Sequence, residues 1–336
     1  MGFYTNKKIL ITGATGTIGQ HLVRQILKDE PAVIRIFSRD EHKQFEMQQA
    51  LHEYSRSLRF LIGDVRDLNR LTRAMKDIDY VFHLAAMKHV PACEYNPFEA
   101  VQTNVIGTQN VIQAAMENDV TKVLFTSTDK AVTPTNTYGA TKLTAERLIS
   151  AAEFQKGPRS TQFTAVRFGN VMGSRGSVIP LLKGQIIERK TVTVTNMNMT
   201  RYMMTPHQAI SLLLTANEQT LGGEVFVLKM PIVRLSDLVE VMIEEISEKY
   251  KISGSIGIEE IGLRPGEKMD EQLMTPDEQD KMFELDYMYI IPPLYSSSNE
   301  HYRPIRTTVF EKNPFAPNIM IEKEVLRSWL INERLI

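Results

Sequence analysis

The sequence contains a single cysteine, Cys93, among its 336 residues. One cysteine cannot form an intrachain disulfide, and it cannot supply the set of thiolates on which cysteine-based metal sites depend. We therefore expect no disulfide and no metal. Cys93 is expected to be a half-buried residue that packs as a small apolar side chain.

An excess of charge of either sign is also lacking. The 39 Lys and Arg residues nearly balance the 40 Asp and Glu residues, which leaves a net charge of −1. Proteins that bind nucleic acid or membrane surfaces in general carry a basic surplus, so neither partner is expected. A hydrophobic content of 43% with 24% charged residues is typical of a globular enzyme.

Long apolar runs are missing too. The run after Lys7 and Lys8 is interrupted by Thr12 and Gly13, which is unlike the apolar core of a signal peptide. No run approaches the ~20 residues of a membrane-spanning helix. Asn6 stands where a myristoylation motif needs Ser or Thr. These features predict a cytoplasmic chain with no membrane partner.

The first positive signal is a glycine motif between a predicted strand, residues 8–12, and a predicted helix. Glycines let the backbone turn tightly and approach a pyrophosphate, and the helix N-terminus supplies free amides and a positive dipole. The motif therefore predicts a dinucleotide site. The residues expected to contact the cofactor here are Gly13, Thr15, Gly16, Thr17, Ile18 and Gly19.

The end of the second predicted strand, residues 33–37, bears on the choice of cofactor. An acidic residue at this point would accept hydrogen bonds from the ribose hydroxyls of NAD. Here Ser38 and Arg39 stand at the strand end, with Lys43 close by. These donors suit a 2′-phosphate, so NADP is expected, with NAD as the less favoured alternative because Asp40 is also present.

Two further strands are predicted at residues 59–65 and 80–86. Asp64 is expected to accept from an adenine amino group beside Val65, or alternatively to cap the following helix. Ala85 and Ala86 leave space for a cofactor, and the amide of Asn104 can brace neighbouring loops. Strands and helices alternate through the first ~125 residues, which predicts an α/β fold with a Rossmann-type doubly wound parallel sheet.

Polar residues follow the next apolar strand, residues 123–125. Thr128, Asp129 and Lys130 should lie at the carboxyl edge of the sheet, where open α/β folds bind ligands. A helix is expected to begin near Tyr138, which shares a helix face with Lys142. A nearby ammonium favours the phenolate form of tyrosine, so Tyr138 could take a proton from a hydroxyl group. The same spacing is also typical of an ordinary amphipathic helix.

These motifs resemble the extended short-chain dehydrogenase/reductase superfamily. The nearer resemblance, over roughly residues 5–290, is to the bacterial UDP-N-acetylglucosamine 4,6-dehydratases of polysaccharide and nonulosonic-acid biosynthesis. Longer members have an N-terminal membrane-spanning region with no counterpart here, and several have methionine where this chain has Tyr138. The motifs shared with the dehydratases are Ser-Arg-Asp-Glu at 38–41, Leu-Ala-Ala-Met-Lys-His-Val-Pro at 84–91, Ser-Thr-Asp-Lys-Ala-Val at 127–132, Arg-Phe-Gly-Asn-Val-Met-Gly-Ser-Arg-Gly-Ser-Val-Ile-Pro at 167–180, Met-Thr-Arg at 199–201 and Arg-Pro-Gly-Glu-Lys at 264–268.

The resemblance implies roles for particular residues. The implied catalytic group is Thr128, Asp129, Lys130, Tyr138 and Lys142, and the last two together with Val171 also contact the cofactor. Arginine binds phosphate bidentately and a carboxylate binds a ribose diol, which agrees with roles in holding a UDP-sugar. The implied substrate-binding residues are Lys88, Asn170, Val178, Pro180, Thr195, Arg201, Arg264 and Glu267.

The resemblance also implies how the chain is divided. Residues 1–168 form an NADP-binding Rossmann domain, whose sheet is completed by residues 203–230, and residues 169–295 form a UDP-sugar-binding lobe. Residues 296–336 are an extension with an amphipathic segment at 323–330, expected to be a docking helix or an oligomer contact. A homo-oligomer is the expected assembly.

The implied reaction converts UDP-N-acetylglucosamine to a 4-keto-6-deoxy sugar. Tyr138, aided by Lys142 and Thr128, takes the 4-hydroxyl proton, Lys130 takes the C5 proton, and Asp129 protonates the leaving 6-hydroxyl. Lys130 can act as a base only while it is uncharged. Two alternatives stay open: a UDP-N-acetylhexosamine 4-epimerase, which needs no acid at O6, and a non-catalytic protein that binds NADP(H) or a UDP-sugar.

Overall fold

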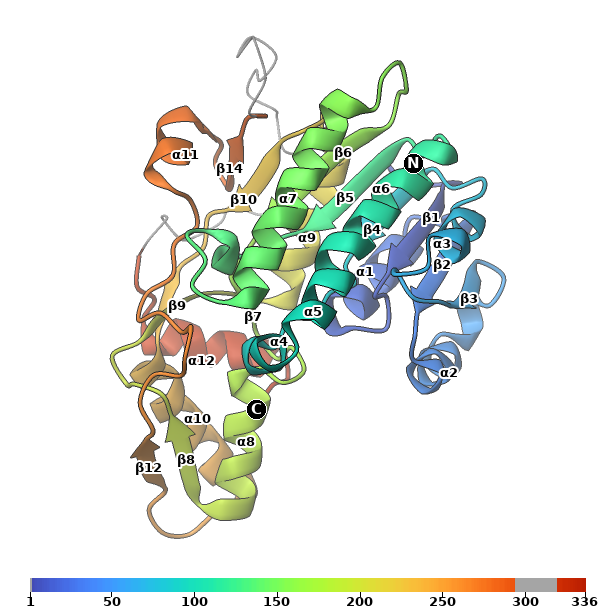
Figure 1. Cartoon of the computed structure of the whole chain (residues 1–336). Coiled ribbons are helices and arrows are strands. Elements are labelled where there is room, and N and C mark those ends of the chain that lie inside the picture. The colour runs from blue at the N-terminus through green and yellow to red at the C-terminus, as the bar shows by residue number, and fades with distance from the viewer. Residues whose placement is uncertain (1, 294–318) are drawn as a thin grey trace.

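The computed structural model describes residues 2–293 and 319–336 and is built around a nine-stranded sheet (Figure 1). Its strands lie in the order β13-β14-β10-β6-β5-β4-β1-β2-β3, parallel except for the β14 and β13 edge. The expected Rossmann-type sheet is thus confirmed. The strands are β1 (Lys8–Thr12), β2 (Val33–Ser38), β3 (Leu58–Ile62), β4 (Tyr80–His83), β5 (Lys122–Thr126), β6 (Gln162–Arg167), β10 (Val225–Leu228), β13 (Phe283–Glu284) and β14 (Met288–Ile291).

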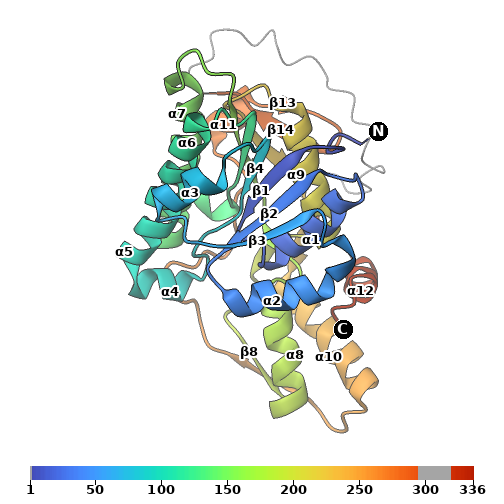
Figure 2. The same ribbon diagram turned by 90° about the vertical axis from the view of Figure 1, so that its right-hand side faces the viewer.

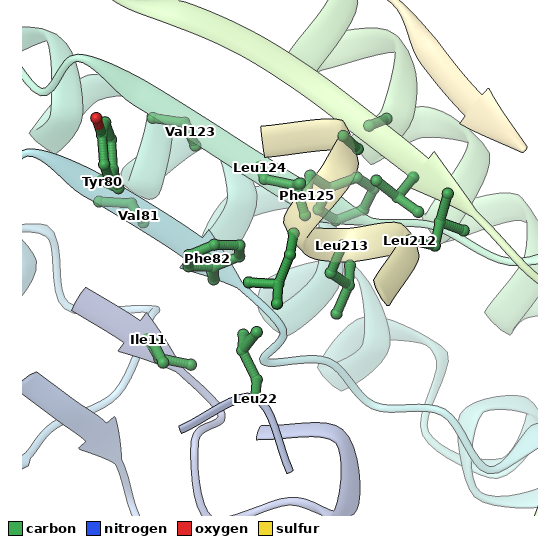
Figure 3. Close-up of a cluster of buried hydrophobic side chains, with 14 of the residues drawn as sticks. Ile11, Leu22, Tyr80, Val81, Phe82, Val123, Leu124, Phe125, Leu212 and Leu213 are labelled. Carbon is green, nitrogen blue, oxygen red and sulfur yellow. The ribbon is translucent and has the colours of Figure 1, made fainter. Parts of the chain in front are cut away.

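Helices cover both faces of this sheet (Figures 1 and 2). One face carries α1 (Thr17–Leu27), α2 (Glu41–Ala50) and α9 (Pro206–Gln219). The other carries α3 (Leu68–Ala74), α6 (Gly107–Glu117) and α7 (Thr137–Gln155). Between the layers, apolar side chains of β1, β4 and β5 pack against α1 and α9, as Figure 3 shows for Ile11, Leu22, Phe82, Leu124 and Leu213. This core fixes the carboxyl ends of the strands, where the site lies.

Side-chain caps fix where several of these helices begin. Asp40 accepts a hydrogen bond from the Lys43 amide at the start of α2, and Asn136 does so from the Gly139 amide at the start of α7. Thr205 forms a capping box with Gln208 before α9. The alternative that Asp64 caps the following helix is wrong, because Asp67 caps α3 by accepting from the Arg70 amide. Asp64 instead accepts from the Arg66 amide within the preceding turn.

A second, smaller hydrophobic cluster lies at the carboxyl side of the sheet, around α8, β8, α10 and β12 (Figure 1). Met242 is fully buried in it, as the amphipathic pattern of residues 235–250 predicts. The elements on this side of the sheet are β7 (Asn170–Val171), β9 (Thr200–Met204) and β11 (Ile232–Arg234) in one small sheet, β8 (Thr191–Val194) and β12 (Gly257–Glu260) in another, and the helices α8 (Val178–Arg189), α10 (Leu235–Tyr250) and α12 (Lys323–Asn332).

The C-terminal helix α12 packs against α10 through Leu326 and Leu330, both buried. Arg327 forms ion pairs with Glu244 and Glu245 of α10. The segment at 323–330 is therefore a helix docked on this chain. Residues 296–318 of the expected extension lie outside the described residues. The remaining short elements are η1 (His52–Tyr54), α4 (Val90–Tyr95), α5 (Pro97–Ala100), the π-helical η2 (Val101–Ile106), η3 (Asp129–Ala131) and α11 (Pro276–Lys281).

The structure bears on two further expectations, which concern the burial of Cys93 and membrane-spanning helices. Cys93 is fully buried on α4, more so than expected, and burial raises the pKa of its thiol to about 11. Among the helices described, none has both the length and the apolar composition that a bilayer crossing requires.

Candidate active site

A groove of about 810 Å³ lies along the carboxyl ends of β1 to β4. The chain runs outward from β1 to β2 and β3 and then returns to β4, so the groove occupies the point where the strand order reverses. Of the cofactor residues expected from the sequence, those that line it are Gly13, Thr15, Gly16, Thr17, Ile18, Gly19, Ser38, Arg39, Asp40, Lys43, Asp64, Val65, Ala85 and Ala86, and the expected substrate residue Lys88 joins them. Asn104, Tyr138, Lys142 and Val171 do not line it.

The glycine turn fits the pyrophosphate of a dinucleotide. Gly13 has a φ of 69°, and a Cβ atom there would lie 2.8 Å from the Ala85 amide nitrogen, so no other residue fits without strain. Gly16 occupies the N-cap of α1 and offers no side-chain acceptor to the first amides of that helix. Those amides and the helix dipole therefore remain available to an anion in the groove.

Asp40 and Arg39, which follow β2, make different interactions. Asp40 is engaged by the Lys43 backbone amide and ammonium, and these hydrogen bonds hold the pKa of its carboxyl below the usual range. Arg39 keeps 60% of its side chain exposed at the groove, with Nη1 3.6 Å from Oδ2 of Asp64. The acidic residue is thus occupied as a helix cap, while the guanidinium faces the groove.

A buried hydrogen-bonded chain follows β5. Thr128 Oγ1 donates to Oδ1 of Asp129 at 2.9 Å, and the Lys130 ammonium lies 3.0 Å from the same oxygen. Asp129 is 0% exposed, and its Oδ2 atom has no hydrogen-bond partner. Lys130 also donates to Oδ1 of Asn170 at 3.3 Å, which joins an expected substrate residue to the expected catalytic group.

The first turn of α7 packs against the hydrogen-bonded residues Thr128, Asp129 and Lys130. A Cβ atom on Gly139 would collide with the Lys130 carbonyl, so glycine is required for the approach. Tyr138 shares a side-chain hydrogen bond with Thr128, which connects it to Asp129 and Lys130. Burial raises the pKa of the Tyr138 hydroxyl well above its usual value, against the hydrogen bond with Thr128, which lowers it.

Lys142 does not meet the expectation that its ammonium faces Tyr138. The ammonium donates instead to the Thr126 carbonyl and lies 3.9 Å from the centroid of the Phe125 ring. Burial lowers the pKa of Lys142 to about 7, against the opposing effect of Glu146. The spacing places both residues on one side of α7, but the nearest carbonyl of β5 takes the ammonium.

Asn104 braces the loop after β4, as expected. Its Oδ1 accepts from the Met87 amide at 2.8 Å, and its Nδ2 donates to the Met87 carbonyl and to Thr141 Oγ1 at 3.0 Å each. The residue lies in the π-helical turn η2, a departure from regular helix that is frequent at functional sites. Asn104 thereby connects the groove wall to α7.

The expected substrate residues are dispersed around the smaller cluster. Val178 and Pro180 begin α8, whereas Val171, which was expected at the cofactor, is buried in β7 as part of the main core. Thr195 contacts the Met199 sulfur at 3.3 Å. Arg264 and Glu267 face each other across a turn at 4.0 Å, whereas Arg201 donates to the carbonyls of Lys268 and Met269 at 3.0 and 2.9 Å. The guanidinium of Arg201 therefore holds the loop 261–275, a use that the sequence did not suggest.

Two residues of this site were missed from the sequence. Arg175 donates from Nη2 to the Thr15 carbonyl at 2.9 Å and from its backbone amide to Thr17 Oγ1 at 3.2 Å, so the 173–177 loop folds over the glycine turn. Glu271, on the loop 261–275, is buried with Oε1 3.7 Å from the Lys130 ammonium. Arg175 belongs to a motif that could have drawn attention, but nothing in the sequence singles out Glu271.

The comparisons with known proteins agree with this architecture. A family model described as polysaccharide biosynthesis protein matches residues 9–293. A relative from Methanocaldococcus jannaschii, 50% identical over 90% of this chain and 91% of its own length, is named an uncharacterized membrane protein. The UDP-N-acetylglucosamine 4,6-dehydratase (inverting) of Campylobacter jejuni and the UDP-glucose 4-epimerase of Rickettsia conorii are each 42% identical over 86% of this chain and 84% of their own lengths.

Solved structures show the same fold. Pen from Bacillus thuringiensis is 52% identical, with a TM-score of 0.90 over 98% of this chain and 99% of that one. MoeE5 in complex with UDP-glucose and NAD is 25% identical, with a TM-score of 0.67 over 78% of this chain and 88% of that one. The likeness thus extends over both the large sheet and the smaller cluster.

Proposed function

This chain belongs to the polysaccharide biosynthesis protein family of extended short-chain dehydrogenases/reductases, and from that premise we propose that it is an NADP-dependent UDP-N-acetylglucosamine 4,6-dehydratase. The observation that carries the proposal is the buried Asp129–Lys130 pair beside Tyr138 and Thr128. Oxidation at a sugar carbon needs a base for one hydroxyl, whereas elimination of water needs a further acid and base. This cluster contains both sets.

The groove would hold the dinucleotide, with the amides at the start of α1 at the pyrophosphate and Arg39 at the 2′-phosphate. A nicotinamide cofactor supplies a hydride acceptor for C4 of the sugar and a hydride donor for C6. The preference for NADP is supported by the exposed Arg39 guanidinium and by the use of Asp40 as a helix cap. The UDP-glucose and NAD named for MoeE5 support the coarser pairing of a UDP-sugar with a nicotinamide cofactor.

The side chains then carry the proton transfers. Tyr138, as the phenolate, accepts the proton of the sugar 4-hydroxyl and becomes a neutral tyrosine, and its hydrogen bond with Thr128 favours the phenolate that begins this step. The 4-ketone makes the C5 proton acidic, and uncharged Lys130 removes it. Asp129 donates its proton to the 6-hydroxyl, which leaves as water, and the C5 position is reprotonated as hydride arrives at C6.

The structure offers a direct route to an uncharged lysine. The ion pair of Asp129 and Lys130 differs from the required acid and amine only in the position of one proton, and the two atoms that exchange it are 3.0 Å apart. No outside base is needed to prepare the pair. Because the Asp129 side chain is fully buried, the neutral form also avoids the cost of an unsolvated charge.

A 4-epimerase is the second candidate, because a 42%-identical relative carries the name UDP-glucose 4-epimerase. Such an enzyme uses Tyr138 for oxidation but returns the hydride to C4 and leaves O6 untouched. The test is to incubate the protein with UDP-N-acetylglucosamine in D₂O and to examine the product by NMR and mass spectrometry. A dehydratase yields a product that lacks one water and carries deuterium at C5. An isomer of unchanged mass without that deuterium contradicts the proposal.

A further inference from the structure

Lys130 faces two carboxylates, and the proposed reaction uses only one of them. Asp129 lies on one side of the ammonium at 3.0 Å, and Glu271 lies on the other at 3.7 Å. The Glu271 side chain is 4% exposed, and its Oε2 atom is buried with no hydrogen-bond partner. The Lys268 ammonium lies 4.0 Å from this oxygen, too far for a hydrogen bond. A buried carboxylate oxygen without a hydrogen bond is costly, and such groups tend to persist where they have a function.

The loop that bears Glu271 is fastened on both sides of this residue. Before it, Arg201 donates to the carbonyls of Lys268 and Met269. After it, the buried Arg167 donates to the Leu273 carbonyl at 2.9 Å and pairs with Glu278 of α11 at 2.8 Å. Arg167 also pairs with Glu146 of α7, the helix that carries Tyr138. The carboxylate of Glu271 is therefore held in place opposite Lys130.

One interval in the proposed reaction requires a second anion at this point. After Lys130 has taken the C5 proton and before Asp129 has released its own, Lys130 is an ammonium and Asp129 is neutral. The Lys130 side chain is only 19% exposed, and an ammonium so poorly solvated is disfavoured without a counter-charge. Among the described residues, Glu271 is the other carboxylate within ion-pair distance of Lys130.

We propose that Glu271 is a positioning residue that supplies the counter-charge to Lys130 while Asp129 is protonated, and thereby assists removal of the C5 proton. The inference rests on the proposed dehydratase function. The proton count is unchanged, because one proton passes from C5 to Lys130, another passes from Asp129 to the leaving oxygen, and Glu271 stays ionised throughout.

The groups around Glu271 set the direction of its response to pH. Burial raises the pKa of Glu271, and the charge of Asp129 raises it further, whereas Lys130, Arg201 and Lys268 lower it. Because burial is the largest of these effects, the carboxyl binds a proton more readily than an exposed glutamate does. As the pH falls, Glu271 becomes neutral, the counter-charge is lost, and elimination slows.

The test compares Glu271→Gln and Glu271→Asp with the wild-type protein. Glutamine keeps the shape and removes the charge, and we expect kcat for water loss to fall about 10- to 100-fold with little change in KM. Exchange of deuterium into C5 should fall by the same factor, and the acid limb of the pH profile should disappear. Aspartate keeps the charge, so Glu271→Asp should retain that acid limb.

Asp270→Asn is the matched control, because Asp270 is an exposed carboxylate on the same loop that bonds to Thr200 rather than to Lys130. It should leave the rate and the pH profile as they are. If Glu271→Gln eliminates water at the wild-type rate with the acid limb intact, the role of Glu271 is wrong while the dehydratase function stands. If the wild-type protein forms no dehydrated product, the dehydratase function is wrong and the role of Glu271 is wrong with it.

Discussion

The cofactor groove and the catalytic cluster lie next to each other but are built in different ways. The groove is open and is formed by glycine turns, helix amides and charged side chains at the strand ends. The cluster is closed, and its polar side chains bond mainly to one another across four separate segments of the chain. A site formed largely by backbone groups tolerates substitution better than a network of buried charged side chains does. The predictions below test this contrast, beginning with the largest effect.

Loss of either member of the buried pair should abolish elimination without emptying the groove. Lys130→Met and Asp129→Asn each remove one proton carrier, and we expect the rate of water loss to fall about 10³-fold. The dissociation constant of NADP, measured by isothermal titration calorimetry, should change by no more than about twofold because neither residue lines the groove. A comparable loss of NADP affinity would contradict the separation of the two regions.

Substitution in the groove should change selectivity and leave the chemistry intact. Arg39→Ala removes the guanidinium that faces the groove, and we expect NADP to lose about 10- to 100-fold in affinity relative to NAD. The two dissociation constants measured side by side give this ratio. Arg24→Ala, an arginine of α1 that does not line the groove, is the control. An unchanged ratio in Arg39→Ala would count against an NADP preference.

Lys142 makes the buried cluster sensitive to pH. Its pKa falls from 10.5 to about 7 on folding, so between these values the unfolded chain binds the extra proton and the folded chain does not. Stability should therefore rise with pH through this window and be flat, for this group, below it. From about pH 7 to about pH 9 we expect a gain of about 2 kcal/mol in the free energy of unfolding. Urea melts of wild type and Lys142→Met, in which the slope should vanish, measure it.

The smallest effect is expected where the two regions touch. Arg175→Ala removes the hydrogen bond to the Thr15 carbonyl and loosens the 173–177 loop over the glycine turn. One such bond corresponds to about a five- to tenfold faster release of the cofactor. Stopped-flow release of NADPH gives this rate, and Lys183→Ala, on α8 away from the groove, serves for comparison. Equal release rates in all three proteins would show that the loop does not retain the cofactor.

The sequence predicted those helices, strands and turns that are determined by residues close together in the chain. The apolar runs of β1, β2, β4 and β5 specify buried strands, the glycine spacing specifies the turn before α1, and Asn136 specifies the start of α7. The spacing of apolar residues also predicts α10. Each of these depends on residues within a few positions of one another.

The unpredicted features depend on residues far apart in the chain. Lys142 turns to the Thr126 carbonyl because β5 lies beneath α7, a packing relation that i, i+4 spacing does not contain. Whether Asp64 or Asp67 caps α3 depends on where the turn after β3 ends. Glu271 lies 141 positions after Lys130 and meets it only because the loop 261–275 crosses the carboxyl edge of the sheet. Side-chain direction and loop paths therefore required the structure.

Arg201 and Arg167, which fasten the loop 261–275, affect how a ligand can enter and leave the site. Arg201 holds this loop before Glu271, and Arg167, which is paired with Glu146 and Glu278, holds it after Glu271. We therefore expect the loop to keep its position when a ligand enters. We therefore expect a sugar nucleotide to enter and leave past the 173–177 loop, in which Arg175 and Gly176 are exposed. We accordingly expect the loop 261–275, which carries Glu271, to stay in place while the 173–177 loop moves.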